Sequence, residues 1–114
     1  MGHGHWRVTW RVSNDTRDWL QLDDAWIPHG RFHASGHLPL SETIRPGAST
    51  EITCPVESSE PPGAVVDNAF LILRVRAGGR GWRLFARMRV AFDARSWPVP
   101  VVETVTAQSI QSEA

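Results

Sequence analysis

The sequence predicts an all-β protein, built as an antiparallel β-sandwich of about seven strands. The first observation is a two-residue alternation of apolar and polar side chains, the period of a strand that buries one face. The second is that these runs are short and are separated by glycine, proline, asparagine and serine. The third is that no segment keeps the period of an amphipathic helix. Short strands with regularly spaced turns are typical of two packed antiparallel sheets.

The first third of the chain contains two strand patterns and an irregular segment. Residues 6–12 alternate, with tryptophan and valine on one face and arginine and threonine on the other. The polar segment 13–16 predicts a turn, because its side chains bond their own backbone. Residues 20–26 form the second strand, which Pro28 ends, and glycine and proline make residues 29–39 irregular.

Two further strands are expected in the middle of the chain. Residues 40–44 form a short strand, and the Pro-Gly pair at 46–47 predicts a turn. Residues 52–56 alternate and predict the next strand, which the Pro-Pro-Gly run at 61–63 ends. Pro55 cannot donate a backbone hydrogen bond, so this strand is expected at a sheet edge.

A long β-hairpin and one last strand complete the predicted fold. Residues 70–92 alternate on both sides of the Gly-Gly-Arg-Gly segment at 78–81, which predicts the turn. Residues 99–105 form the last strand. We therefore expect a single domain over residues 1–106, followed by a flexible C-terminal tail of residues 107–114. The expected core-facing residues of the hairpin are Leu71, Leu73, Val75, Trp82, Leu84, Ala86, Met88, Val90 and Phe92.

Length and composition indicate one folded domain. The chain has 114 residues, 41% of them hydrophobic, which suffices for a core without disulfide or metal supports. Its one cysteine, Cys54, cannot form an internal disulfide. Cys54 alternates with Ile52 and Val56, so we expect a buried, unreactive thiol. No apolar run has the length of a signal region or a membrane span, so the expected location is cytoplasmic, without membrane contact.

Two turn segments carry a resemblance to a known family. Residues 12–16 (Val-Ser-Asn-Asp-Thr) and residues 40–52 resemble bacterial immunoglobulin-like domains of the cell-adhesion-related type. In that family a strand ends in an Asn-containing turn, and a later Pro-Gly turn leads into another strand. The resemblance spans most of the chain and implies an immunoglobulin-like β-sandwich. It also implies a domain that binds or spaces other molecules rather than an enzyme.

The hairpin carries an unusual charge pattern in a chain whose formal net charge is zero. Lysine is absent, and six of the twelve arginines lie between Arg74 and Arg89. No acidic residue occurs between Asp67 and Asp93. Any pairing of the two strands that matches their apolar faces puts most of these arginines on one outer face. The predicted partner- or anion-binding residues are Arg74, Arg76, Arg80, Arg83, Arg87, Arg89, Phe70, Ile72 and Phe85.

This charge favours binding through the outer face of the hairpin. Two guanidinium groups about 5 Å apart repel by on the order of 1 kcal/mol in water. Acids of neighbouring strands, with Glu51, Glu57 and Glu103 as candidates, would relieve the repulsion, and so would side chains that spread into solvent. The alternative is an external anion, because arginine binds oxyanions through two parallel hydrogen bonds.

Three functions are open at this point. The preferred one is a non-enzymatic module that binds a protein partner or forms a homo-oligomer, because arginine mixed with exposed aromatic residues is typical of protein interfaces. The second is anion or nucleic-acid binding by the same arginines, with aromatic rings stacking on bases. The third is a histidine site for zinc or copper.

The loops supply the remaining candidate residues, because loops on a rigid sandwich commonly carry binding groups. His29, His33 and His37 recur every four residues, but the surrounding prolines and glycines exclude a helix that would align them. They are the candidate ligands of the metal hypothesis, and no cofactor is expected otherwise. The candidate binding residues of the loops are Trp26, His29, Arg31, Phe32 and Trp97.

Nothing in the sequence predicts catalysis. Asp23 and Asp24 are adjacent, so on a regular strand their carboxylates point to opposite faces and cannot act together. No nucleophile elbow, phosphate-binding loop or zinc-protease motif occurs. The expected function is therefore binding, without catalytic residues.

Overall fold

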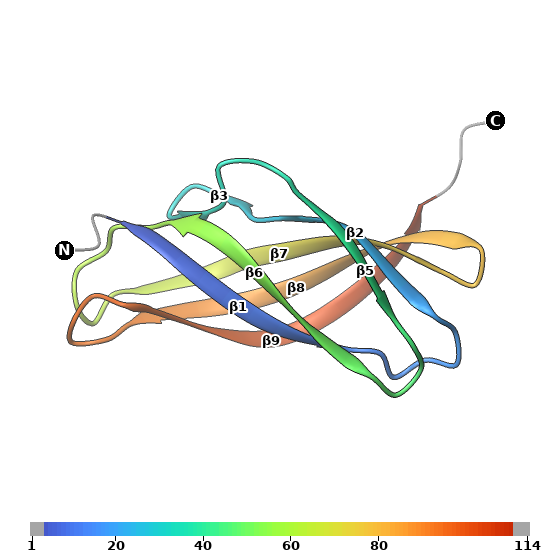
Figure 1. The fold of residues 1–114 in the computed structure, drawn as a ribbon. Coiled ribbons are helices and arrows are strands. Elements are labelled where there is room, and N and C mark those ends of the chain that lie inside the picture. Colours follow the sequence, from blue (N-terminus) through green and yellow to red (C-terminus); the bar gives the residue numbers. More distant parts are fainter. Residues whose placement is uncertain (1–3, 111–114) are drawn as a thin grey trace.

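The computed structural model describes residues 4–110, which form two antiparallel β-sheets packed face to face (Figure 1). The strands are β1 (His5–Ser13), β2 (Leu20–Trp26), β3 (Pro28–His29), β4 (Phe32–His33), β5 (Leu38–Ile44), β6 (Ser49–Glu57), β7 (Val65–Ala77), β8 (Arg80–Phe92) and β9 (Pro98–Ile110). The four-stranded sheet has the order β1-β6-β4-β3, and the five-stranded sheet has the order β5-β2-β7-β8-β9. In Figure 1, β1 and β6 cross in front of β7, β8 and β9.

The predicted all-β sandwich is confirmed. Within residues 4–110, seven strands have at least seven residues each. The two-residue strand β4 lies inside the segment 29–39 that the sequence marks as irregular, and β3 begins one residue before that segment. Glycine and proline allow only brief pairing there. In the same part of the chain, no helix is long and apolar enough to cross a membrane.

The core lies between the sheets and is built from the inward side of each strand. Of the nine residues expected to face the core from the hairpin, seven are buried, and Trp82 and Leu84 are partly buried against it. Trp10 and Ile52 contribute from the four-stranded sheet. Burial of each large apolar side chain stabilises the fold by about 1.5 to 3 kcal/mol, so this interface holds the two sheets together.

A two-residue turn fixes the register of the β7–β8 hairpin. Gly78 and Gly79 have positive φ angles of 59° and 74°, which residues with a side chain rarely adopt. Such a turn matches the twist of the strands it joins. Ala77 is therefore paired with Arg80, and the pairing continues along both strands.

A buried asparagine joins two loops at the end of β1. Asn14 is 1% exposed. Its side-chain amide donates hydrogen bonds to the carbonyl oxygens of Asp18 and Ile44, at 2.8 Å each. Its carbonyl oxygen accepts hydrogen bonds from the backbone N–H and the hydroxyl of Thr16. All of its hydrogen-bonding capacity is used, so Asn14 connects the β1–β2 turn to the end of β5.

The last strand is longer than the sequence indicates. β9 continues to Ile110, which is paired with Gly81. Residues 107–110 therefore belong to the sheet, although the sequence assigns them to a tail. The physical reason is that β8 extends equally far and offers backbone partners to them. Residues 111–114 lie outside the described residues.

The expectation that Pro55 lies on an edge strand is wrong, because β6 pairs with β1 on one side and with β4 on the other. Pro55 is paired with Arg7 of β1. On the other side of β6, β4 makes a pair only at Glu57. The missing N–H of Pro55 therefore interrupts no second ladder.

Replacement of Asn14 by alanine is expected to lower the free energy of unfolding by about 2 to 4 kcal/mol, because several backbone groups lose their partners. Chemical denaturation measures this change. Ser13→Ala is the matched control, since the Ser13 hydroxyl bonds only the hydroxyl of Ser49 at an exposed position. Its effect should stay within about 0.5 kcal/mol. Equal stability of the two variants contradicts the role of Asn14.

Burial of Cys54 predicts a specific loss of stability in alkali. Burial raises the pKa of its thiol from the ordinary value of 9.0 to about 11. The unfolded chain therefore loses this proton at a lower pH than the folded chain, so stability falls as the pH rises from 9.0 to about 11. The chain has no lysine or tyrosine, so no other side chain titrates in this range.

The expected loss is roughly 2 to 3 kcal/mol across this interval, and Cys54→Val should remove it. Urea denaturation at a series of pH values provides the measurement. An equally steep decrease in the Cys54→Val variant would show that another group is responsible.

Candidate functional site

The outer face of the β7–β8 hairpin gathers most of the arginine and aromatic residues that the sequence singles out. Arg74 is paired with Arg83 across the two strands, and the neighbouring pairs keep the same alternation. Residues paired in this way share one face of a sheet. We define the arginine face as Arg74, Arg76, Arg83, Arg87, Arg89, Phe70, Ile72 and Phe85.

β-Bulges in the strands around this face bring acidic side chains to it. A bulge adds one residue to a strand and shifts its inside-outside alternation. The strand registers shift at Asp23 in β2, at residues 67–68 in β7 and at Glu103 in β9. Each of these positions provides an acid to an arginine of the arginine face.

The bulge in β2 corrects the expectation for Asp23 and Asp24. Leu22 and Ala25 are both buried in the core, so the two carboxylates between them lie on the outer side together. Asp23 accepts hydrogen bonds from Arg76 at 2.8 and 3.1 Å. The two-residue alternation fails here because the bulge adds one residue between Leu22 and Ala25, so two consecutive side chains lie on the outer side of the strand.

The electrostatic effect of the Asp23–Arg76 pair appears in both partners. The hydrogen bond from Arg76 holds the pKa of Asp23 below its ordinary value, against the opposing effect of desolvation. The same bond raises the pKa of Arg76. The pair needs an ionised Asp23, so its contribution to stability is present near neutral pH and is lost as the pH falls through the lowered pKa. Arg76 is largely exposed, so water screens the pair and its contribution is small.

Two further acids lie more loosely against the arginine face. Glu103 lies 3.8 Å from Nε of Arg87, and Asp67 lies 3.8 Å from Nε of Arg89. Both distances exceed hydrogen-bond length, and all four side chains are substantially exposed. These pairs reduce the repulsion between the arginines of the face.

The sequence identifies only part of this set of acids. Glu103 is a candidate from the sequence and lies against the arginine face. Glu51 and Glu57, the other two candidates, lie on β6 in the four-stranded sheet. The acids that lie against the arginine face in their stead are Asp23 and Asp67. A strict two-residue alternation does not predict this, because each of them lies at a β-bulge, where the alternation shifts.

Arg74 and Arg83 have no acidic partner within ion-pair distance among the described residues. They are directly opposite each other in the ladder, with their backbones about 5 Å apart. Asp24 is beside Arg74 in the register. Its Oδ2, however, accepts a hydrogen bond of 2.6 Å from Nδ1 of His37. The two arginines therefore keep a positive charge that the chain does not neutralise by contact.

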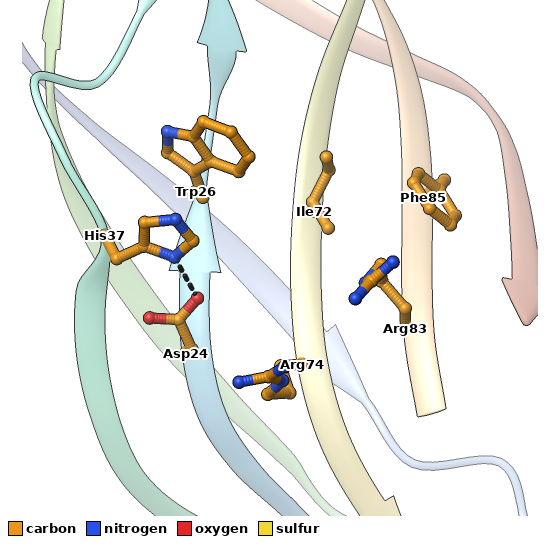
Figure 2. A pocket seen from close by; sticks show the side chains of 7 residues that line it. All are labelled: Asp24, Trp26, His37, Ile72, Arg74, Arg83 and Phe85. Atoms are coloured by element: carbon orange, nitrogen blue, oxygen red, sulfur yellow. Dashed lines mark hydrogen bonds and ion pairs between the residues drawn. The ribbon is translucent and has the colours of Figure 1, made fainter. Parts of the chain in front are cut away.

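These two arginines line a hollow with a volume of about 270 Å³ (Figure 2). Figure 2 shows the lining side chains on one side of the sheet, with Arg83 extending from β8 toward β7. The ring of Trp26 stacks on His37, with centroids 4.5 Å apart and planes tilted by 23°. The complete lining is Asp24, Trp26, His37, Ile72, Arg74, Arg83 and Phe85.

The chemistry of the hollow suits a ligand with two different parts. The guanidinium groups of Arg74 and Arg83 offer several N–H donors to an oxyanion. Trp26, Ile72 and Phe85 offer apolar and aromatic surface beside them. Arginine and aromatic side chains are the residue types that contribute most to binding at protein interfaces.

Three of the other candidates lie outside the hollow. Arg80 is on the opposite side of the hairpin from the arginine face, and its guanidinium lies over the ring of Trp82, 5.9 Å from the centroid. Arg31 forms an ion pair with Glu60. Trp97 is exposed just before β9. The fold therefore does not join these residues to one site.

The prediction that Phe32 is a binding residue of a loop is wrong. Its side chain is 0% exposed and belongs to the core. The reason is that β4 pairs with β6 and becomes part of the four-stranded sheet. Phe32 therefore packs between the sheets and offers no surface to a ligand.

Two histidines of the metal hypothesis belong to strands of the four-stranded sheet, and the third, His37, lies in the loop before β5. His33 lies on β4 in the four-stranded sheet, in a hollow with Glu57 and Arg31. His37 lies in the hollow of the arginine face. His29 belongs to β3, and its side chain lies outside the described part of the structure. Among the described residues, no group of three His, Cys, Asp or Glu side chains has metal-binding geometry.

Sequence reasoning missed Asp24 as a site residue and considered His37 only as a loop residue that could be a candidate metal ligand. The spacing of the core residues indicates that Asp24 points outward. Leu20 and Leu22 are two positions apart, as are Ala25 and Ile27, but three positions separate Leu22 from Ala25. Such a slip in the two-residue period is the sequence mark of a bulge. For His37, the sequence alone shows no link to β2.

Comparison with protein-family models, curated proteins and solved structures finds no match to this chain. Its architecture is a two-sheet antiparallel β-sandwich. On this sandwich, the hollow of the arginine face combines two arginines that have no acid within ion-pair distance among the described residues with aromatic walls.

Charge reversal at Arg83 is expected to stabilise the fold. Arg83→Glu replaces the repulsion from Arg74 by attraction, so the free energy of unfolding should rise by about 0.5 to 1 kcal/mol at low salt. The gain should shrink at high salt, because salt screens exposed charges. Urea denaturation at both salt concentrations provides the measurement.

The matched control is Arg76→Glu, which changes the net charge equally but puts a second acid beside Asp23. This variant should lose stability. If both variants lose stability to the same extent, Arg74 and Arg83 do not repel each other appreciably.

Proposed function

We propose that this protein is a non-enzymatic binding module whose arginine face binds an acidic segment of a partner protein. Arg74 and Arg83 hold a carboxylate of that segment in the hollow. Trp26, Ile72 and Phe85 contact an apolar or aromatic side chain next to the carboxylate. Among the described residues that line the hollow there is no serine, threonine or cysteine.

The observation that carries this proposal is the unneutralised Arg74–Arg83 pair. The other three arginines of the face each have an acid within 4 Å. The two that do not are opposite each other and line the same hollow. A bound oxyanion would accept charge-assisted hydrogen bonds of about 1.5 to 3 kcal/mol each. It would also remove the repulsion between the two guanidinium groups.

We favour a protein partner over nucleic acid because only two arginines of the arginine face have no acid within ion-pair distance among the described residues. Affinity for a nucleic-acid backbone comes from several cations that neutralise successive phosphates. Here the chain itself pairs most arginines of the face and leaves two. Phosphate or nucleic-acid binding by Arg74 and Arg83 is the alternative, because Trp26 and Phe85 offer ring surface on which a base could stack.

The proposal includes an immunoglobulin-like identity for the sandwich and a cytoplasmic location. Two turns support the first part. Gly47 has a positive φ of 79° in the Pro-Gly turn, and its N–H donates a 2.8 Å hydrogen bond to the carbonyl oxygen of Asn14. The two turns that carry the family resemblance are thus joined directly. A rigid sandwich of this kind presents a binding face at low entropic cost.

Binding of acidic peptides tests the proposed function. The probe is a short peptide in which glutamate alternates with phenylalanine, and its glutamine counterpart lacks the charge. Nuclear magnetic resonance of protein labelled in its tryptophans follows the indole resonance of Trp26. We expect the acidic peptide to shift this resonance at low salt. The combined variant Arg74→Gln and Arg83→Gln should weaken binding at least about tenfold.

The matched control is the combined variant Arg7→Gln and Arg11→Gln, which removes two exposed arginines from β1 in the four-stranded sheet. It should bind the acidic peptide as the unaltered protein does. Tighter binding of inorganic phosphate or of a single-stranded oligonucleotide would favour the alternative. Peptide binding that is insensitive to the loss of Arg74 and Arg83 would remove the proposal.

A further inference from the structure

β9 forms an edge of the five-stranded sheet and is paired only with β8 (Figure 1). The strand is 13 residues long. No other strand of residues 4–110 pairs with its far side. An unpaired edge presents backbone N–H and carbonyl groups, and it can act as a template for a strand from another molecule.

Only the first half of this edge carries features that discourage pairing. Pro98 and Pro100 have no backbone N–H, and the bulge at Glu103 distorts the strand. Residues 104–110 contain no proline, glycine or charged residue. Natural edge strands are normally blunted by such features along their length. The second half of β9 is therefore open to pairing.

The inward side of β9 is apolar and uncovered. Val102 and Val105 are 42% and 61% exposed, although they are paired with the buried residues Met88 and Ala86 of β8. The four-stranded sheet thus covers the β8 side of this face and leaves the β9 side open. An added strand with apolar inward side chains would remove these valines from water.

The outward side of β9 lies beside the arginine face. Thr104 is paired with Arg87, and Thr106 is paired with Phe85. Arg87 already reaches β9, because its Nε lies 3.8 Å from Glu103. This Nε is buried and makes no hydrogen bond among the described residues. A strand added beyond β9 lies about 10 Å from β8, which is two strand spacings. A carboxylate on that strand can therefore approach the Arg87 guanidinium.

We infer that residues 104–110 of β9 accept an extended segment of a partner protein as a sixth strand of this sheet. The segment alternates apolar residues on its inward side with acidic and aromatic residues on its outward side. Acidic residues lie beside Thr104 and Gln108, in the rows of Arg87 and Arg83, and an aromatic residue lies beside Thr106. Charge complementarity with these arginines selects this partner.

A second copy of the chain fits the edge less well. Its β9 offers a single acid, Glu103, which already lies beside Arg87 of its own hairpin. A symmetric pair along the whole strand also puts the half with Pro98 and Pro100 against the open half of the other copy. The prolines then interrupt the new ladder at both ends.

Amide hydrogen exchange in the intact protein tests this inference. The probe is a peptide with the central sequence Glu-Val-Phe-Val-Glu. A second peptide of the same sequence, methylated at alternate backbone nitrogens, cannot pair as a strand. We expect the first peptide to protect the amides of residues 104–110 and the methylated peptide to give no protection. Val105→Lys should weaken binding about tenfold or more, because it puts a charge on the inward side.

Val99→Lys is the matched control, since Val99 is also exposed on β9 but lies between the two prolines. It should leave peptide binding unchanged. Equal protection by the methylated peptide, or unchanged binding to the Val105→Lys variant, overturns the inference. The inference is also overturned if sedimentation shows a homodimer that the Val105→Lys substitution converts to a monomer, because a second copy of the chain then pairs with this edge.

The edge site is separate from the hollow, so the two proposals can fail independently. Arg74→Gln should weaken the response of the Trp26 indole resonance and leave the protection of residues 104–110 intact. Val105→Lys should do the reverse. If Arg74→Gln abolishes the protection of β9, the edge is not a distinct site.

Discussion

Like charges repel each other on the outer face of the β7–β8 hairpin, and the arrangement of the surrounding strands depends on this repulsion, because they place acids beside the arginines. The core requires one apolar face on each strand, and the alternation then sends five arginines to the other face together. β2, β7 and β9 each contain a bulge beside this face, and each bulge provides one acid: Asp23, Asp67 and Glu103. Bulges thus act here as electrostatic devices, because they turn an acid outward without moving a core residue out of place.

Among the described residues, no acid lies within ion-pair distance of Arg74 or Arg83, and these two arginines line the hollow. Asp24 is the acid nearest to Arg74 in the register, but its carboxylate is bonded to His37, which in turn stacks on Trp26. The result is a hollow with an aromatic wall and two guanidinium groups that have no acid within ion-pair distance among residues 4–110. Unrelieved repulsion costs stability in the free protein. When a ligand of opposite charge binds, the repulsion between the two guanidinium groups is removed, and this adds to the binding free energy.

The same hairpin links the hollow to the open edge of the sheet. Arg83 lines the hollow and lies in the row of Gln108 on β9, while Arg87 reaches β9 directly. β8 therefore contributes to two neighbouring surfaces, the hollow for which we propose a carboxylate ligand and the edge for which we propose an added strand. Backbone pairing supplies affinity at an edge, and side chains on alternate positions supply selectivity.

The sequence by itself determined the strands and their inward faces, because burial of alternate apolar residues is a local property of the chain. It predicted the hairpin, its glycine turn and the position of Cys54 in the core, and the structure agrees. The tertiary structure decided which charges meet. Asp23 and Arg76 are far apart in sequence, and their contact depends on a bulge and on the β2–β7 pairing. It also decided that Phe32 is buried and that β9 is left with an open edge. Strand order and sheet packing are set by non-local contacts, which no two-residue pattern contains.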